Sequence, residues 1–199
     1  MTFSDQERRI RSDVVSRLRV LLPGARIIHE LDVEKGAVRA DLAAVTVDQL
    51  WLVEIKSEKD KLHRLSRQIQ FFHPVCHGLL VAAHEKWCGR AANYPNCDAR
   101  KVIEFHGAGH LWQWPGAGAP TWTLPEPRHP WTRRMLDLLS AEEVRAEAVL
   151  VGFGTPSCSA AALADQMCLR MSGHAVTQAV CRQLRARSFS RADAPELAA

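Results

Sequence analysis

The sequence has no apolar run that approaches the ~20 residues needed to cross a membrane. Residues 1–7 are too polar and acidic for a secretory signal. The six cysteines include no pair at two-residue spacing, so zinc-knuckle and iron–sulfur patterns are missing and reduced thiols are predicted. We therefore expect a cytoplasmic protein that does not associate with membranes.

Extremes of composition are missing as well. Lys and Arg number 26 against 22 Asp and Glu, which gives a formal charge of +4, and 47% of residues are apolar. These values are ordinary for a globular protein and exclude a disordered or collagen-like chain. The 199 residues fit one domain, or one domain with a small addition. Residues 152–156 are glycine-rich but lack the lysine of a phosphate-binding loop, which argues against an ATP site.

The pattern of apolar residues predicts a helix at the start of the chain. Ser4 and Glu7 have the spacing of a capping box, and Pro23 with Gly24 ends the segment. The apolar stripe consists of Ile10, Val14, Leu18 and Leu21. The opposite face, which we expect to be solvated, carries Arg8, Arg9, Arg11 and Arg19.

Alternating and apolar segments then predict a sheet. The expected strands are residues 26–31, 39–47, 49–56 and 78–83, with edge strands at 101–105 and 110–114. The run 50–53 is apolar on both faces, which is typical of a central strand covered on both sides. A predicted helix at 60–72 separates two of these strands, and this order calls for parallel pairing.

Composition changes after residue 115. The segment 116–131 is rich in proline and glycine and is predicted to be a linker. Helical patterns follow at 132–150 and 160–187, and the tail from residue 188 is expected to fray. The predicted division is therefore a core of residues 1–115, a linker of 116–131 and a helical region of 132–199.

An acid and a base end one otherwise apolar strand, in the sequence Glu54-Ile55-Lys56. Because side chains alternate along a strand, Leu52, Glu54 and Lys56 point to the same face. Burying such charges costs several kcal/mol unless they are paired or hold a metal. The end of this strand is therefore the first candidate site.

Asp41 is predicted to lie beside Glu54. If strands 39–47 and 49–56 form a hairpin, residue i pairs with roughly 95 − i, which places Asp41 opposite Glu54. Two carboxylates, with the Ile55 carbonyl as a third oxygen, suit a hard divalent cation such as Mg²⁺ or Mn²⁺. Lys56 would orient the attacking water or neutralise charge that develops on a phosphate.

These residues resemble a known nuclease signature. Asp41 with Glu54-Ile55-Lys56 is similar to the D…(D/E)-x-K motif of the PD-(D/E)XK, or restriction-endonuclease-like, superfamily. The expected order of helix, three strands, helix and strand is similar to that family's core. Gln68-Ile69-Gln70-Phe71-Phe72 resembles the Gln-x-x-x-Tyr motif of the RecB-type branch, and residues 54–68 resemble a small bacterial and phage group within it. The resemblance covers residues 1–115.

The resemblance implies an α/β fold with a restriction-endonuclease-like core, in which helices flank a mixed central sheet, and a helical C-terminal appendage. It implies a Mg²⁺- or Mn²⁺-dependent nuclease that hydrolyses phosphodiester bonds of DNA, or else of RNA. The implied catalytic residues are Glu30, Asp41, Glu54, Lys56 and Gln68, with the metal at Asp41, Glu54 and the Ile55 carbonyl. Two departures are Ala40, where the family has its proline, and Phe72, which lacks the tyrosine hydroxyl.

Basic residues follow the proposed site. Lys59, Lys61, Arg64 and Arg67 are predicted to contact nucleic-acid phosphates, with a solvated helix face as the alternative. A second run consists of Arg182, Arg185, Arg187 and Arg191, for which a DNA-contacting arm and a solvated terminus are both open. Histidines 73, 77 and 84 suggest zinc, but Pro74 breaks the helix that would align the first two.

Other functions stay open at this point. One alternative is a catalytically silent member of the fold that binds nucleic acid or a protein, with Asp41, Glu54 and Lys56 as a salt-bridged strand end. Another is an interaction protein of a phage or mobile element that works through its C-terminal helices. The sequence leaves open endo- or exonuclease cleavage, selectivity and oligomeric state, a homodimer included.

Overall fold

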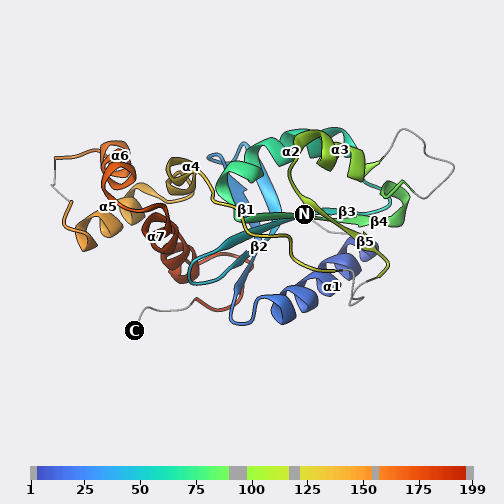
Figure 1. Cartoon of the computed structure of the whole chain (residues 1–199). Coiled ribbons are helices and arrows are strands. Elements are labelled where there is room, and N and C mark those ends of the chain that lie inside the picture. The colour runs from blue at the N-terminus through green and yellow to red at the C-terminus, as the bar shows by residue number, and fades with distance from the viewer. Residues whose placement is uncertain (1–3, 90–97, 117–121, 154–156, 196–199) are drawn as a thin grey trace.

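The computed structural model describes residues 4–89, 98–116, 122–153 and 157–195. Helix α1 (Asp5–Leu21) begins as predicted, with the Ser4 side chain accepting a hydrogen bond from the Glu7 amide at 3.1 Å. Its apolar stripe packs on one face of a five-stranded sheet (Figure 1). None of the helices in the described ranges is long and apolar enough to cross a membrane.

The strands follow one another in the sheet in chain order, from β1 to β5. They are β1 (Arg26–Val33), β2 (Val38–Val45), β3 (Leu50–Lys56), β4 (Gly78–His84) and β5 (His110–Trp114). The first two pairings are antiparallel and the last two parallel. The predicted α/β class, with a mixed sheet between helices, is therefore confirmed. The β2–β3 register is also the predicted one, since Leu42 pairs with Val53 and Val45 with Leu50.

Alternation along β3 separates the two layers. Trp51, Val53 and Ile55 face the layer that contains α1, whereas Leu50 and Leu52 face the opposite layer. That second layer contains the short helices η1 (Leu62–Arg64), α2 (Leu65–Phe72), η2 (His73–Val75), η3 (Glu85–Trp87) and α3 (Ala99–His106). Glu54 and Lys56 belong to the same alternating set as Leu50 and Leu52, so the fold directs them towards α2.

The segment predicted as an edge strand at 101–105 lies in helix α3, so that prediction is wrong. The Asp98 side chain accepts a hydrogen bond from the Arg100 amide at 2.9 Å and begins the helix. Gly107, at φ 56°, ends it in the left-handed conformation that favours glycine. Two adjacent apolar residues, Val102 and Ile103, resembled a strand, but the buried positions Ala99 and Ile103 are four residues apart.

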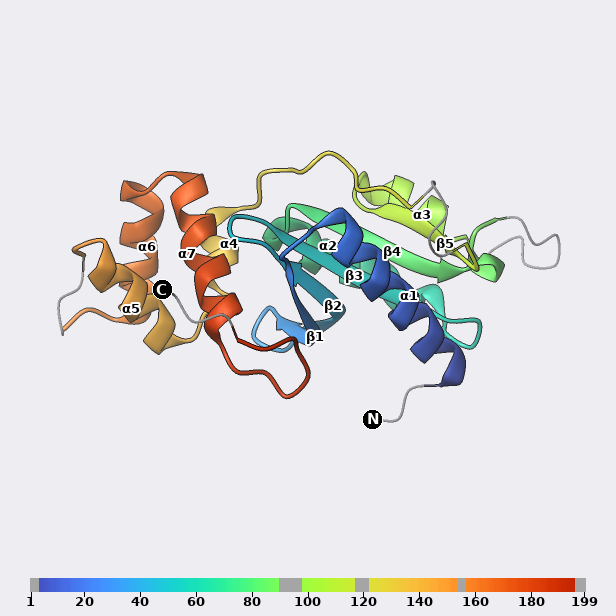
Figure 2. The ribbon, with the colours of Figure 1, turned by 90° about the horizontal axis from the view of Figure 1, so that it is seen from below.

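The C-terminal helices form a group at one end of the molecule (Figures 1 and 2). They are α4 (Thr132–Leu136), α5 (Ala141–Leu150), α6 (Ala160–Arg170) and α7 (Gly173–Ala186). Each of the two predicted helical segments is thus divided, because Ser140 and Ser172 cap new helices within them. The buried residues of these helices join the same apolar cluster as one face of the sheet.

Residues 122–131, which we call the crossing segment, connect the core to α4 without helix or strand. They belong to the predicted linker, of which 117–121 lie outside the described residues. The ring of Trp122 stacks on Trp112 with centroids 4.9 Å apart. The amide of Arg128 donates to the His77 carbonyl at 2.8 Å, and that of Trp131 to the Pro74 carbonyl at 2.9 Å. The crossing segment is therefore held against the core at several points.

The tail was expected to fray, and within the described residues this prediction is wrong. The His29 amide donates to the Arg191 carbonyl, and the Asp193 amide donates to the Ile27 carbonyl, both at 2.9 Å. Asp193 also accepts a hydrogen bond from the Ile27 amide through its side chain at 3.0 Å. The tail thus pairs with the outer edge of β1, which periodicity could not reveal because the partners are far apart in sequence.

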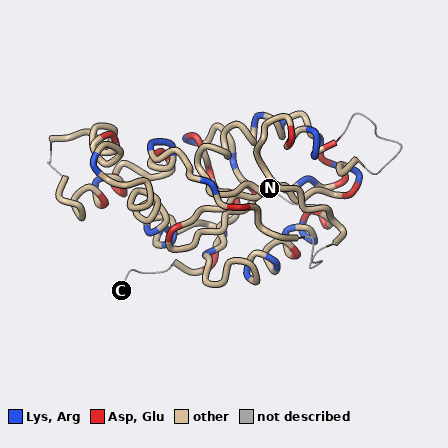
Figure 3. The backbone as a smooth tube through the Cα atoms, in the orientation of Figure 1, with Lys and Arg blue, Asp and Glu red and all other residues tan. Residues whose placement is uncertain are grey.

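The C-terminal arginines form neither a free arm nor a plain solvated terminus. Arg182 binds the carboxylate of Glu147, and Arg187 binds that of Glu143. Arg185 donates to the Val45 carbonyl at 2.7 Å. Figure 3 shows basic and acidic residues interspersed over both ends of the molecule. These arginines hold the C-terminal helices together and to the sheet.

Candidate active site

The two predicted carboxylates meet where β2 and β3 separate. The last pair of that ladder is Leu42 with Val53, so Asp41 and Glu54 occupy the next register position. The amide of Ile55 donates to Oδ2 of Asp41 at 2.7 Å, which replaces a backbone ladder bond with a side-chain bond. The hairpin therefore brings Asp41 beside the end of β3, as its register predicted.

Lys56 and Gln68 complete a buried polar group around Glu54. Nζ of Lys56 donates to Oε1 of Glu54 at 2.5 Å and to Oε1 of Gln68 at 3.0 Å. Nε2 of Gln68 donates to the same Glu54 oxygen at 2.6 Å. The side chains of Glu54 and Lys56 are only 4% and 3% exposed. Three residues predicted from sequence thus lie in mutual contact, with Gln68 supplied by α2.

The second oxygen of Glu54 lacks a partner. Oε2 is buried and forms no hydrogen bond within the part of the chain that the structure describes. Burial raises the pKa of Glu54, and burial together with the Glu54 charge raises the pKa of Asp41 well above its ordinary value of 3.8. Buried carboxylates normally have full sets of partners, so the open Oε2 of Glu54 is a position that a cation could fill.

Arg11 belongs to the site, although the sequence placed it on a solvated helix face. Its side chain is 5% exposed, and one of its nitrogens, NH2, lies 3.1 Å from Glu7, 3.1 Å from Glu30 and 3.3 Å from Asp41. Its other terminal nitrogen donates to the Asp41 carbonyl at 2.6 Å. Glu7, Arg11, Val14 and Leu18 follow one helical stripe, which is the signal that could have revealed its burial.

Glu30 lies opposite Asp41 but does not adopt ordinary strand geometry. Its φ of 59° is left-handed, a conformation that costs a residue with a side chain of order 1 kcal/mol or more. Ile28 and Leu31 face the same apolar cluster although they are three residues apart, so side-chain alternation shifts at Glu30. Ion pairs to Arg11 and Arg39, each at 3.1 Å, hold the Glu30 carboxylate. Glu30 therefore contributes to the site indirectly, through its ion pairs with Arg11 and Arg39.

These residues line an open cleft of about 830 Å³. One wall is the β1–β2 hairpin, from Gly36 to Arg39, and the other is α2 with the turn before it. Arg64 and Arg67 line the cleft, but Lys59 and Lys61 do not. All four side chains are exposed. The structure therefore divides the predicted phosphate-contacting set into two residues within the cleft and two outside it.

The donor set suits a cation that keeps most of its water. Within the described residues, no three side chains of His, Cys, Asp or Glu are arranged to hold a metal. Glu30, the third nearby acid, is already paired with two arginines. Asp41, Glu54 and the Ile55 carbonyl supply oxygens at the end of β3, and Mg²⁺ is commonly held by one or two carboxylates together with water and phosphate.

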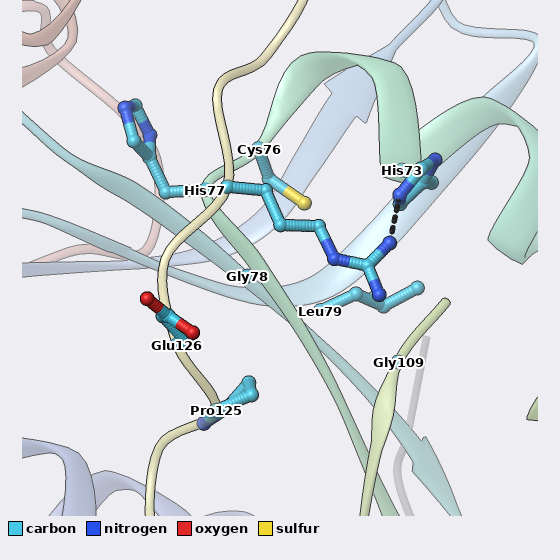
Figure 4. Close-up of a pocket in the computed structure, with 9 residues that line it drawn as sticks. His73, Cys76, His77, Gly78, Leu79, Gly109, Pro125 and Glu126 are labelled. Carbon is cyan, nitrogen blue, oxygen red and sulfur yellow. Dashed lines mark hydrogen bonds between the residues drawn. The ribbon is translucent and has the colours of Figure 1, made fainter. Parts of the chain in front are cut away.

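The three histidines that suggested zinc have other partners. His73 contacts Arg128, and both residues line a small pocket together with Cys76; a dashed line at His73 in Figure 4 marks the contact. His77 accepts a hydrogen bond from the Leu50 amide, and His84 accepts one from the Lys86 amide. Among the described residues, these histidines do not belong to a group of three or more side chains that could hold a metal.

Comparison with models of protein families gives a match to the first part of the chain. A family model described as bacteriophage P4 protein cII matches residues 1–96. The matched part includes α1, strands β1 to β4 and the site residues from Glu7 to Gln68. No curated protein and no solved structure matches the chain.

Proposed function

We propose that this protein is a metal-dependent nuclease that hydrolyses phosphodiester bonds, with DNA as its substrate, on a restriction-endonuclease-like core. The observation that carries the proposal is the convergence of Asp41, Glu54 and Lys56 in one cleft, with Oε2 of Glu54 buried and unpartnered. The order α1, β1–β3, α2, β4 around a mixed sheet supports the proposed core. The similarity to a phage protein family supports a role in a phage or another mobile element.

Asp41, Glu54 and the Ile55 carbonyl would hold Mg²⁺ or Mn²⁺. The ion, when bound, supplies an acidified water and charge stabilisation for the phosphate. The amide of Ile55 fixes one Asp41 oxygen and Arg11 fixes its backbone carbonyl, so the carboxylate is held before a ligand arrives. Such preorganisation avoids the cost of ordering the ligand during catalysis.

Lys56 is the group that would act on water and on the phosphate. Its ammonium is held between Glu54 and Gln68, both of which line the same cleft. An ammonium in such a buried position stabilises negative charge more strongly than it would in water. Gln68 orients both neighbours at once, since its amide donates to Glu54 and its carbonyl accepts from Lys56.

A catalytically silent relative of the fold is the second candidate. The observation that favours it is the 2.5 Å contact between Lys56 and Glu54, which is also what a structural ion pair would show. A purely structural pair, however, is expected to satisfy both carboxylate oxygens, because an unpaired buried oxygen is destabilising. The open Oε2 therefore favours the nuclease.

Cleavage of supercoiled plasmid tests the proposal. We expect nicking with Mg²⁺ or Mn²⁺, and binding without turnover with Ca²⁺. Parallel reactions with single-stranded DNA and RNA would identify the nucleic acid that is cleaved. Activity that persists in excess chelator would exclude a metal mechanism, and a complete lack of cleavage together with retained DNA binding would favour the silent relative.

A further inference from the structure

A second cavity, of about 210 Å³, lies between the core and the C-terminal helices. Its walls are the β2–β3 turn at Asp48, the residue before β4 (His77), the crossing segment at His129, and the first turn of α7. None of these residues lines the cleft that contains Glu54 and Lys56. The cavity is therefore separate from the proposed nuclease site, and its ligand can be inferred whether or not the protein is a nuclease.

His77 presents a fixed hydrogen-bond donor to this cavity. Its Nδ1 accepts a hydrogen bond from the Leu50 amide at 3.1 Å, so the neutral ring carries its proton on Nε2. Burial lowers the pKa of His77, which keeps the ring neutral. The residue is 8% exposed, and Nε2 has no partner among the residues that the structure describes. In Figure 4 the ring points away from Cys76 and from the small pocket drawn there.

The first turn of α7 presents two more donors. The Ser172 side chain accepts a hydrogen bond from the Ala175 amide at 3.1 Å, and the Ser172 carbonyl accepts one from the Val176 amide at 3.0 Å. The amides of Gly173 and His174 have no partner in the described ranges. Helix amino termini with free amides attract anions through these donors and through the helix dipole.

We infer that this cavity binds a phosphate group, held by Nε2–H of His77 and by the free amides of Gly173 and His174. These three unpartnered groups are donors, so an acceptor is the ligand that fits them. Nε2 of His77 carries a proton and cannot ligate a metal in this tautomer. His129 and His174 also line the cavity. The phosphate belongs either to a small molecule or to a nucleic-acid backbone.

Charges around the cavity set the strength of binding. Asp48 is the acid among its lining residues, and its carboxylate accepts a hydrogen bond from the Thr46 hydroxyl at 3.1 Å. It opposes an anion. Arg128 lines the cavity, but its guanidinium is turned towards His73 and the Gly107 carbonyl. Hydrogen-bond donation, rather than a full positive charge, is therefore the main attraction for an anion. We expect a dissociation constant for free phosphate of roughly millimolar size.

Gly173→Pro removes one of these donors without disturbing the helix. Proline is favoured at the first position of a helix, where its missing N–H breaks no helical bond. Ser172, at φ −66° and ψ 154°, already has the conformation that a following proline requires. A Cβ at Gly173 would meet only Thr132 Cγ2, at an ordinary 3.5 Å. Gly173→Ala is the matched control, since it adds the Cβ and keeps the amide.

Titration of inorganic phosphate, followed by ³¹P NMR and calorimetry, gives the first readout. We expect the alanine variant to bind like the wild type and the proline variant to bind about tenfold more weakly or worse. Asp48→Asn should strengthen binding, whereas it would weaken binding of a cation. Equal melting temperatures of the two Gly173 variants would show that the loss is local.

DNA binding in the presence of chelator distinguishes the source of the phosphate. If the cavity holds a backbone phosphate, Gly173→Pro should weaken DNA binding relative to Gly173→Ala. If it holds a small molecule, only phosphate binding should change. Indistinguishable binding of phosphate and of DNA by the two variants, or weaker phosphate binding by Asp48→Asn, would overturn the inference.

Discussion

Glu147 and Glu54 are both buried, and each contacts one basic residue and one glutamine. They differ in how these partners are divided between the two carboxylate oxygens. Glu147, on α5, is 0% exposed and receives Arg182 on both oxygens and Gln183 on one. Glu54, on β3, receives Lys56 and Gln68 on the same oxygen, and its other oxygen has no partner among the described residues. The first arrangement is that of a satisfied structural ion pair, whereas the open oxygen of the second is explained by the cation site that we propose.

Replacing each glutamate with glutamine gives the largest expected contrast. Glu54→Gln should abolish metal-dependent nicking and weaken metal binding, because it removes a ligand charge and little volume. Glu147→Gln should leave nicking per folded molecule unchanged but lower the free energy of unfolding by about 1–3 kcal/mol, because Arg182 loses its ion pair. Plasmid nicking and chemical denaturation of both variants measure this. Loss of activity in both, or in neither, would remove the distinction between the two residues.

Removal of the lysine tests the next largest effect. Lys56→Ala should reduce nicking by on the order of 10²-fold or more, since the group acts on water and on charge in the transition state. Metal should bind as well or better, because the ammonium repels the cation. Lys59→Ala, outside the cleft, is the matched control. Calorimetric metal titration and the nicking assay measure these two effects. Cleavage by Lys56→Ala at the wild-type rate would show that Lys56 has a structural rather than a catalytic role.

The pH dependence of stability should differ between metal-free and metal-bound protein. Asp41 and Glu54 have pKa values above their ordinary 3.8 and 4.5, so near and above these values the folded state holds more protons than the unfolded state. Their contribution to stability is therefore greatest at low pH and declines as pH rises towards the raised pKa values. Mg²⁺ should remove this decline.

Thermal melts from pH ~4 to ~8, with chelator or with Mg²⁺, measure that decline. Asp41→Asn should flatten the metal-free profile, whereas Glu126→Gln, at an exposed position, should leave it unchanged. If the metal-free profile is the same in Asp41→Asn and the wild type, the buried carboxylates do not destabilise the metal-free protein. Their partners within the protein would then be sufficient without a cation.

The smallest effect concerns the two halves of the basic cluster. If Arg64 and Arg67 contact phosphates from within the cleft, replacing both with alanine should reduce the log–log salt slope of DNA binding by roughly 1.4–1.8. The pair Lys59 and Lys61 lies outside the cleft and should contribute less. Equal slopes for the two double variants would show that the four basic residues form a solvated face without specific phosphate contacts in the cleft.

The parts of the fold that could be predicted from sequence depend on neighbours along the chain. The β2–β3 register followed from a short turn and strand alternation, and this sufficed to place Asp41 beside Glu54. Gln68 was implied by the resemblance to the Gln-x-x-x-Tyr motif, and the helix that follows Lys56 brings it to that lysine. Each of these inferences spans fewer than about 30 residues, where the geometry of one hairpin or one crossover fixes the answer.

The parts that failed depend on distant partners. Arg11 pairs with Glu30 and Asp41, which lie 19 and 30 residues further along the chain, so these partners could not be predicted from the helical stripe that buries it. The left-handed Glu30 is held by arginines, although a strand pattern predicts an extended residue there. Helix α3 was missed because a two-residue apolar pair does not distinguish a helix from an edge strand. The candidate site was thus predicted from its acids, Lys56 and Gln68, whereas the arginines that pair with Glu30 and Asp41 were missed.

The pairing of the C-terminal tail with the edge of β1 has a consequence for folding during synthesis. Asp193 follows Ile27, whose amide it binds, by 166 residues. At ~5–20 residues per second, a ribosome needs about 10–30 s to make that interval. During that time β1 is an open edge strand, with backbone groups free to pair with another chain. The first strand to be synthesised therefore waits longest for its partner, and newly made chains are most prone to aggregate in this interval.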